Sequence, residues 1–328
     1  MEIMIRGLAF IAAALCAAVM GFAIQRGATC TVAAVDQLVN QRKAQRLLAL
    51  VEASLWVCGG LLIAHRLSVP AQVPMGYALS AQTLAGAVLL GLGAFVNRAC
   101  VFGAIARFGS GEWAYALTPV GFYLGCLLVD MVFVPTPASR LAGGSIVYST
   151  PLAAAWLVAA AFAGRIGAAC VRGRVALQAL VTDTLWTPHA ATSVIGIAFL
   201  AMLLLVGAWA YTDALSDLAR GMTRGLPARL LLGACLLAGA VVGGWTAGRF
   251  RSMRVDSATL LRCLSGGAMM GWGSLLIPGS NDGLILVGMP MLWPYAWAAF
   301  LTMCVAIGIA QWAQARMAAR WRAPVRAA

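Results

Sequence analysis

The stretch GAFVNRACVFG, residues 93–103, aligns without a gap on the stretch GSLLIPGSNDG, residues 273–283. Both stretches begin and end with glycine, and Cys100 holds the same place in the first as Ser280 holds in the second. Duplicated glycine-rich segments that interrupt apolar sequence are typical of transporters whose binding site lies where two halves of the chain meet. The pair therefore predicts where the functional residues lie.

A second pair of segments repeats this pattern. GFAIQR, residues 21–26, aligns on GWTAGR, residues 244–249. A sulfur-containing residue follows each arginine after four positions, Cys30 in the first segment and Met253 in the second. We therefore expect Met253 to occupy in the second half the position that Cys30 occupies in the first.

The composition indicates an integral membrane protein. Hydrophobic residues make up 62% of the 328 residues and charged residues 10%, far from the mixture of a soluble domain. About nine apolar runs are long enough to cross a bilayer. The runs lie near residues 4–25, 47–65, 80–97, 113–134, 150–169, 191–211, 229–247, 258–277 and 293–315. The predicted fold is an all-α polytopic membrane protein with short broken or re-entrant helices.

The net charge of +13 comes from basic residues gathered in short loops. The clusters are Arg42, Lys43 and Arg46; Arg165, Arg172 and Arg174; Arg249, Arg251 and Arg254; and Arg316, Arg320, Arg322 and Arg326. This distribution follows the positive-inside rule and favours contact with lipid headgroups over nucleic acid. It predicts a bacterial cytoplasmic membrane protein with its C-terminus in the cytoplasm and its N-terminus outside.

The chain divides into two pseudo-symmetric halves within a single transmembrane domain. The first repeat covers about residues 1–135 and the second about residues 191–315. A connecting region covers 136–190, and a basic cytoplasmic tail covers 316–328. The sequence leaves open whether the repeats are parallel or inverted.

Pro278-Gly279 interrupts an apolar run where the middle of the bilayer is expected. Irregular backbone at this depth persists only where protein shields it or water fills a cavity. Such a break leaves helix N-termini inside the membrane, where their free N–H groups favour an anion. Arg26 and Arg98, close before Cys30 and Cys100, are candidates to balance its charge, with an interfacial position as the alternative.

Thiols at the breaks would provide selectivity. A neutral cysteine is a weak donor and a polarizable acceptor, so it suits a soft sulfur atom. The predicted substrate-binding residues are Cys30, Cys100, Ser280, Arg26, Arg98, Asn281 and Met253. For Ser280 the alternative is a helix cap, and for Met253 a place in the core. The nine cysteines form no CxxC pair and there are two histidines, so we expect neither a metal nor a cofactor.

Glu52 lies within an apolar run and is the candidate for proton coupling. Pairing with the basic cluster around Arg46 is the alternative role for this carboxylate.

Three stretches resemble the YeeE/YedE family of bacterial membrane proteins. They are GFAIQRGATC at 21–30, GLGAFVNRACVFGAIARFGSG at 91–111 and GGAMMGWGSLLIPGSNDGLILVGMP at 266–290. The resemblance implies an hourglass-shaped permease that passes thiosulfate between cysteine thiols at central loops without chemical change. Cys100 matches a family cysteine, whereas Ser280 stands where thiosulfate carriers have cysteine.

The sequence therefore predicts a permease, not an enzyme, that takes up a small sulfur-containing anion, with thiosulfate as the first candidate. A passive anion channel is one alternative. A membrane-embedded sulfur relay, in which Cys30 carries a persulfide, is another. A non-transporting subunit that docks a cytoplasmic sulfur-carrier protein on its basic face is the third.

Overall fold

The computed structural model describes residues 2–133, 135–141, 144–151, 153–165, 167, 185–222 and 225–322. Its described elements are helices, apart from one isolated bridge between Tyr77 and Arg140. The basic residues Arg172, Arg174, Arg224 and Arg326, and with them the end of the basic tail, lie outside the described residues.

Four segments of the chain share one order of elements: a long helix, a break, a short helix and a second long helix. The first is α1 (Glu2–Gly27), α2 (Thr31–Gln41) and α3 (Gln45–Arg66). The second is α4 (Ala81–Asn97), α5 (Val101–Gly109), the 3₁₀ turn Trp113–Ala116 and α6 (Leu117–Val132). The third is α9 (Pro188–Val206), α10 (Tyr211–Ala219) and α11 (Leu226–Thr246). The fourth is α12 (Ser257–Leu276), α13 (Asn281–Gly283), the π-helical turn Leu284–Gly288 and α14 (Pro294–Arg322).

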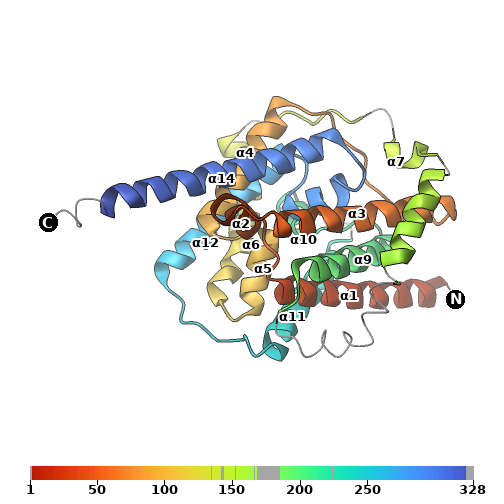
Figure 1. Cartoon of the computed structure of the whole chain (residues 1–328), viewed down its shortest axis with the longest axis horizontal. Coiled ribbons are helices and arrows are strands. Elements are labelled where there is room, and N and C mark those ends of the chain that lie inside the picture. Colours follow the sequence, from red (N-terminus) through yellow and green to blue (C-terminus); the bar gives the residue numbers. More distant parts are fainter. Residues whose placement is uncertain are drawn as a thin grey trace.

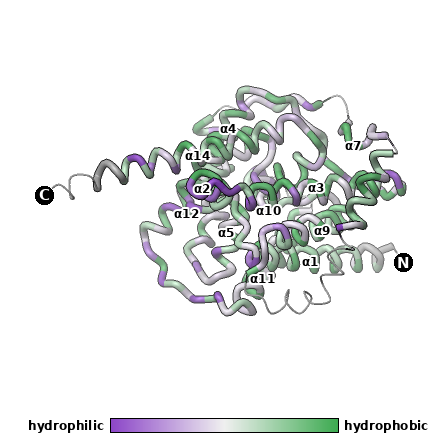
Figure 2. The backbone as a smooth tube through the Cα atoms, viewed as in Figure 1, coloured by the Kyte–Doolittle hydropathy of each residue, from purple (hydrophilic) through white to green (hydrophobic). Residues whose placement is uncertain are grey.

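Between the two pairs of segments lie α7 (Ile146–Ser149) and the apolar helix Ala153–Arg165. Figure 1 shows the N-terminus of α1 and the C-terminal end of α14 at opposite ends of the molecule. Figure 2 shows hydrophobic residues along the long helices and hydrophilic residues in the loop between α11 and α12.

The predicted all-α polytopic fold is confirmed, but the count of nine spans is not. Seven described helices are long and apolar enough to cross a membrane, or eight if the bent pair of α12 and residues 281–288 forms one span. Within the predicted run near residues 150–169, the structure describes the apolar helix Ala153–Arg165, which alone is shorter than a bilayer requires; residues 152, 166, 168 and 169 lie outside the described residues.

The two halves pack on each other in a regular way. α1 packs against α9 and α11, and α9 packs against α1 and α3. In the same manner α4 packs against α12 and α14, and α12 packs against α4 and α6. The first long helices of two segments, one from each half, therefore pack on each other. Each of these helices also packs on the second long helix of the other segment.

The corresponding helices α4 and α12 run in opposite directions. A Cβ on Gly86 would lie 2.8 Å from the carbonyl oxygen of Gly273, and one on Gly93 would lie 2.8 Å from that of Gly266. Residue numbers that rise along α4 thus meet falling numbers along α12. This antiparallel contact between equivalent helices favours an inverted repeat over a parallel one.

Each of the four breaks contains a residue with positive φ. The residues are Ala28 at 46°, Arg98 at 55°, Gly207 at 91° and Gly279 at 155°. Left-handed backbone ends a right-handed helix, and it costs a residue with a side chain about 1–2 kcal/mol. The breaks are therefore built into the backbone at four corresponding places, of which the sequence patterns identified three.

Candidate substrate-binding site

The residue that precedes each short helix has extended backbone and occupies the N-cap position, without a side-chain capping hydrogen bond. Cys30 precedes α2, Cys100 precedes α5, Ala210 precedes α10 and Ser280 precedes α13. The matched positions are therefore Cys30 with Ala210 and Cys100 with Ser280. Contacts between α2 and α5, α5 and α13, and α10 and α13 bring the four starts into one group.

In the first half, the two thiols meet at the starts of α2 and α5. The backbone N–H of Thr31 donates to the Sγ of Cys100 over 3.1 Å. The Sγ of Cys30 lies 2.5 Å from the position that a Cβ on Gly103 would occupy, so it packs on the first turn of α5, the helix that Cys100 precedes. Cys100 is fully buried, whereas Cys30 is half-buried. This part of the site offers soft sulfur atoms together with helix N-termini.

One threonine joins the first half of the chain to the second. The hydroxyl of Thr31 donates to the Oδ1 of Asn281 over 3.2 Å, and both residues are buried. Asn281 directly follows Ser280, so Thr31 links Cys100 to the second-half motif through its backbone and its side chain. The sequence motifs at residues 93–103 and 273–283 therefore lie next to each other in the protein.

In the second half, hydroxyl groups surround a buried carboxylate. The hydroxyls of Ser280 and Thr212 both donate to the Oδ1 of Asp282 and also contact each other. The backbone N–H of Thr212, in the first turn of α10, donates to the Oδ2 of Asp282 over 3.2 Å. Ser280 thus points at a carboxylate, which is a different environment from that of Cys100.

This difference makes the site electrostatically asymmetric. Helix N-termini carry partial positive charge, and α2, α5 and α10 all begin here. Asp282 interacts directly with the start of α10 and so offsets its partial charge. The starts of α2 and α5 face sulfur instead. We therefore expect the thiol part of the site to hold an anion better than the hydroxyl part.

Three cavities are lined by residues at or next to these helix starts. One of about 120 Å³ is mostly apolar and is lined by Val101 and Thr212, among others. A small cavity of about 10 Å³, enough for about one water molecule, is lined by Cys30 and Arg46 near the starts of α3 and α9. A larger cavity of about 550 Å³ is lined by Ala210, Asp213, Gly279 and Gly283, among others. Cys100, Ser280 and Asn281 line neither of these last two cavities and are closed off from solvent.

The two predicted arginines lie apart from the thiols. Arg26 is fully buried, donates to the Oγ1 of Thr246 over 2.9 Å and lies over the ring of Phe22. Arg98 is exposed and ends α4. Arg46 is the basic side chain that shares a cavity with Cys30, and the sequence interpretation assigned it only to a basic loop.

The expected equivalence of Met253 and Cys30 is wrong. Met253 lies in the loop between α11 and α12 and is 56% exposed, and its backbone N–H donates to the carbonyl of Gly111. The two glycines that begin the aligned segments, Gly21 and Gly244, allow helix backbones to pack closely. A Cβ on Gly21 would lie 1.8 Å from the carbonyl oxygen of Leu236, and one on Gly244 would lie 1.9 Å from that of Gly109.

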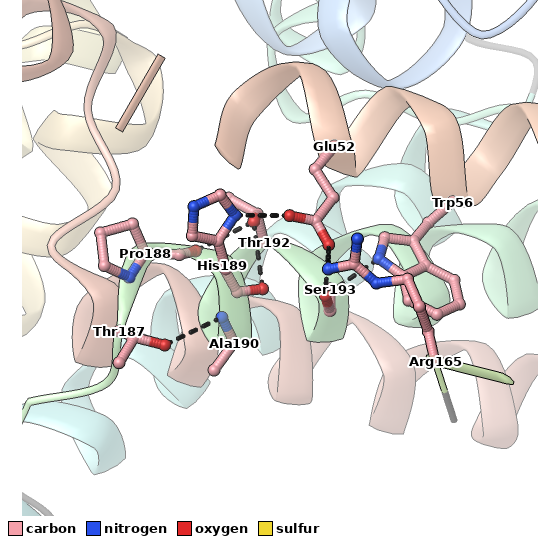
Figure 3. Close-up of polar contacts among 9 residues, drawn as sticks. All are labelled: Glu52, Trp56, Arg165, Thr187, Pro188, His189, Ala190, Thr192 and Ser193. Atoms are coloured by element: carbon pink, nitrogen blue, oxygen red, sulfur yellow. Dashed lines mark hydrogen bonds and ion pairs between the residues drawn. The ribbon is translucent and has the colours of Figure 1, made fainter. Parts of the chain in front are cut away.

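Glu52 forms an ion pair with Arg165 and a polar contact with the Nδ1 of His189. Figure 3 shows its carboxylate between Arg165 and His189. The hydroxyl of Ser193 donates to the Oε1 of Glu52 over 3.5 Å. The side chain of Glu52 is 10% exposed, and Glu52 lines none of the three cavities. Its partners are therefore Arg165 and His189, where the sequence interpretation expected the cluster around Arg46.

Three contributors to the site carried no clear sequence signal. Thr31 is the first residue of α2 and Thr212 is the second residue of α10, and nothing in the motifs distinguished them. The third break was hidden within the expected run at 191–211. The glycine at Gly207 followed by polar Thr212 and Asp213 is the signal that could have revealed it.

Long apolar helices, paired halves and a buried polar group at four internal helix starts define a polytopic α-helical membrane transport protein. The family profile described as "Sulphur transport" matches residues 26–309, which is most of the chain. The protein therefore belongs to this family, the YeeE/YedE family of sulfur-related membrane transporters. No curated protein that was compared with the chain matches it.

Proposed function

We propose that the protein takes up thiosulfate across the bacterial cytoplasmic membrane. The route leads past Cys30, Cys100, Asn281 and Ser280, between the smallest and the largest of the three cavities. One observation carries this proposal: Thr31 bonds to Cys100 and to Asn281 at once, so thiol and amide groups from both halves share one buried site. The family match supports a sulfur compound as cargo.

The chemistry of the site favours an anion with a soft atom. Helix N-termini stabilise negative charge without carrying a full positive charge, so the anion can also leave. The sulfur atoms of Cys30 and Cys100 suit the terminal sulfur of thiosulfate, since thiols are polarizable and weakly hydrogen-bonding. Arg46 beside Cys30 would attract the anion at the smaller cavity, a role that the sequence interpretation gave to Arg26 and Arg98.

The test is labelled thiosulfate uptake in cells that lack other thiosulfate carriers, together with growth on thiosulfate as the sulfur source. We expect the wild type to take up label, Cys100→Ala to abolish uptake and Cys30→Ala to reduce it. Normal uptake by Cys100→Ala would contradict the site. Uptake indifferent to a pH gradient would favour the passive channel, and a reductant-labile sulfur on Cys30 would favour the sulfur relay.

A further inference from the structure

The amide of Asn281 has a donor that the protein leaves unused. Asn281 is 1% exposed, and its Nδ2 has no hydrogen-bond partner among the described residues. Leaving a buried donor unpaired costs about 1–3 kcal/mol, so native structures rarely retain one without a reason. A ligand that brings an acceptor to this point would remove the cost.

The other end of the same amide is fixed. Its Oδ1 accepts the hydroxyl of Thr31, whose backbone N–H is bonded to the thiol of Cys100. The unused donor therefore belongs to a group that already contains a thiol and the start of α2, an 11-residue helix. A free amide donor, a helix N-terminus and a thiol in one buried group together favour an anion that has both an oxygen and a soft atom.

We propose that Asn281 binds the oxygen end of the transported anion through Nδ2, while Cys30 and Cys100 face its sulfur end. This inference rests on the proposed function and extends it by giving the substrate an orientation. It assigns selectivity to two kinds of group: the thiols select the soft atom and the amide selects the oxyanion. Ser280 is committed to Asp282, so it holds the carboxylate in place and does not replace the amide.

The experiment measures labelled thiosulfate uptake by purified protein in liposomes and determines the half-saturating concentration and the maximal rate. Asn281→Leu keeps the approximate shape and removes the donor. Thr31→Val removes the other half of the Thr31–Asn281 hydrogen bond and leaves Nδ2 in place. The Thr31 variant therefore shows the effect of losing the Thr31–Asn281 hydrogen bond alone. It controls for the possibility that the amide of Asn281 only stabilises the structure.

We expect Asn281→Leu to raise the half-saturating concentration about tenfold or more, because a hydrogen bond to a charged ligand is lost. Thr31→Val should raise it less than about threefold, since it removes a neutral hydrogen bond that does not contact the ligand. Size-exclusion profiles would confirm folding, and Asn281→Ser would be measured if the leucine variant does not fold.

Equal effects of the two substitutions, or an unchanged half-saturating concentration in the Asn281 variants, would overturn the inference while leaving thiosulfate transport intact. A wild-type protein that takes up no thiosulfate would overturn the proposed function and the inference with it. The two failures are therefore distinguishable.

Discussion

The Sγ of Cys30 lies against Gly103, only 2.5 Å from the position that a Cβ on this glycine would occupy. The thiol of Cys30, just before α2, thus packs directly on the first turn of α5. At the matched position in the second half, a Cβ on Gly283 would find its nearest neighbour 3.8 Å away, at the Oδ1 of Asp213. A side chain at Gly103 would therefore collide with Cys30, whereas a methyl group at the matched Gly283 would make only ordinary van der Waals contact.

Gly103→Ala should displace the thiol of Cys30 and lower thiosulfate uptake about tenfold, because overpacking costs about 1–3 kcal/mol or forces the neighbour to move. Gly283→Ala should retain most of the uptake. Both variants place a methyl group in the first turn of a short helix, so they form a matched pair. Similar losses in both, measured at equal amounts of membrane protein, would show that the contact with Cys30 is not decisive.

The second-half motif leads to a prediction for Ser280. Ser280→Cys creates the cysteine that the resembling thiosulfate carriers have at this place. A thiol donates more weakly to Asp282 than a hydroxyl does, but it provides another soft contact for the substrate. We expect thiosulfate uptake to be preserved or improved. Loss of uptake would indicate that the hydrogen bond from Ser280 to Asp282 is essential.

Hydropathy and glycine spacing predicted much of this fold. The runs at 80–97 and 258–277 correspond closely to α4 and α12, because a bilayer demands continuous apolar helix. The alignment of 93–103 with 273–283 succeeded because equivalent breaks retain the same glycines. This alignment identified the two motifs that contain Cys100 and Asn281, the residues to which Thr31 is hydrogen-bonded.

The remaining features depend on tertiary contacts that no local pattern records. Gly21 and Gly244 share their spacing because both allow helix backbones to approach closely, so the pattern assigned Met253 to a break that does not exist. The residue that corresponds to Cys30 in the second half is Ala210. Its side chain has no polar group, so nothing in the sequence assigned it to the site. Arg26 is near Cys30 in sequence, yet its side chain extends to Thr246 on another helix.

The larger cavity should form part of the transport route. Ser216 lines this cavity and is half-buried, so Ser216→Cys should react with a small, positively charged thiol reagent. The modified side chain should then block uptake. Ser252→Cys, in the exposed loop between α11 and α12, should react as well without loss of uptake. Uninhibited transport after complete modification at Ser216 would place the route elsewhere.

Glu52 provides the last prediction, since its ion pairs imply a structural role. Glu52→Gln keeps the shape of the side chain and removes the charge between Arg165 and His189, which are 59% and 46% exposed. Because such half-exposed pairs contribute up to about 1 kcal/mol each, the melting temperature should fall by about 2–4 °C. Glu112→Gln, which removes a single half-buried pair with Arg107, should lower it less. The pH dependence of uptake should stay unchanged in Glu52→Gln; its disappearance would instead make Glu52 the proton-coupling residue.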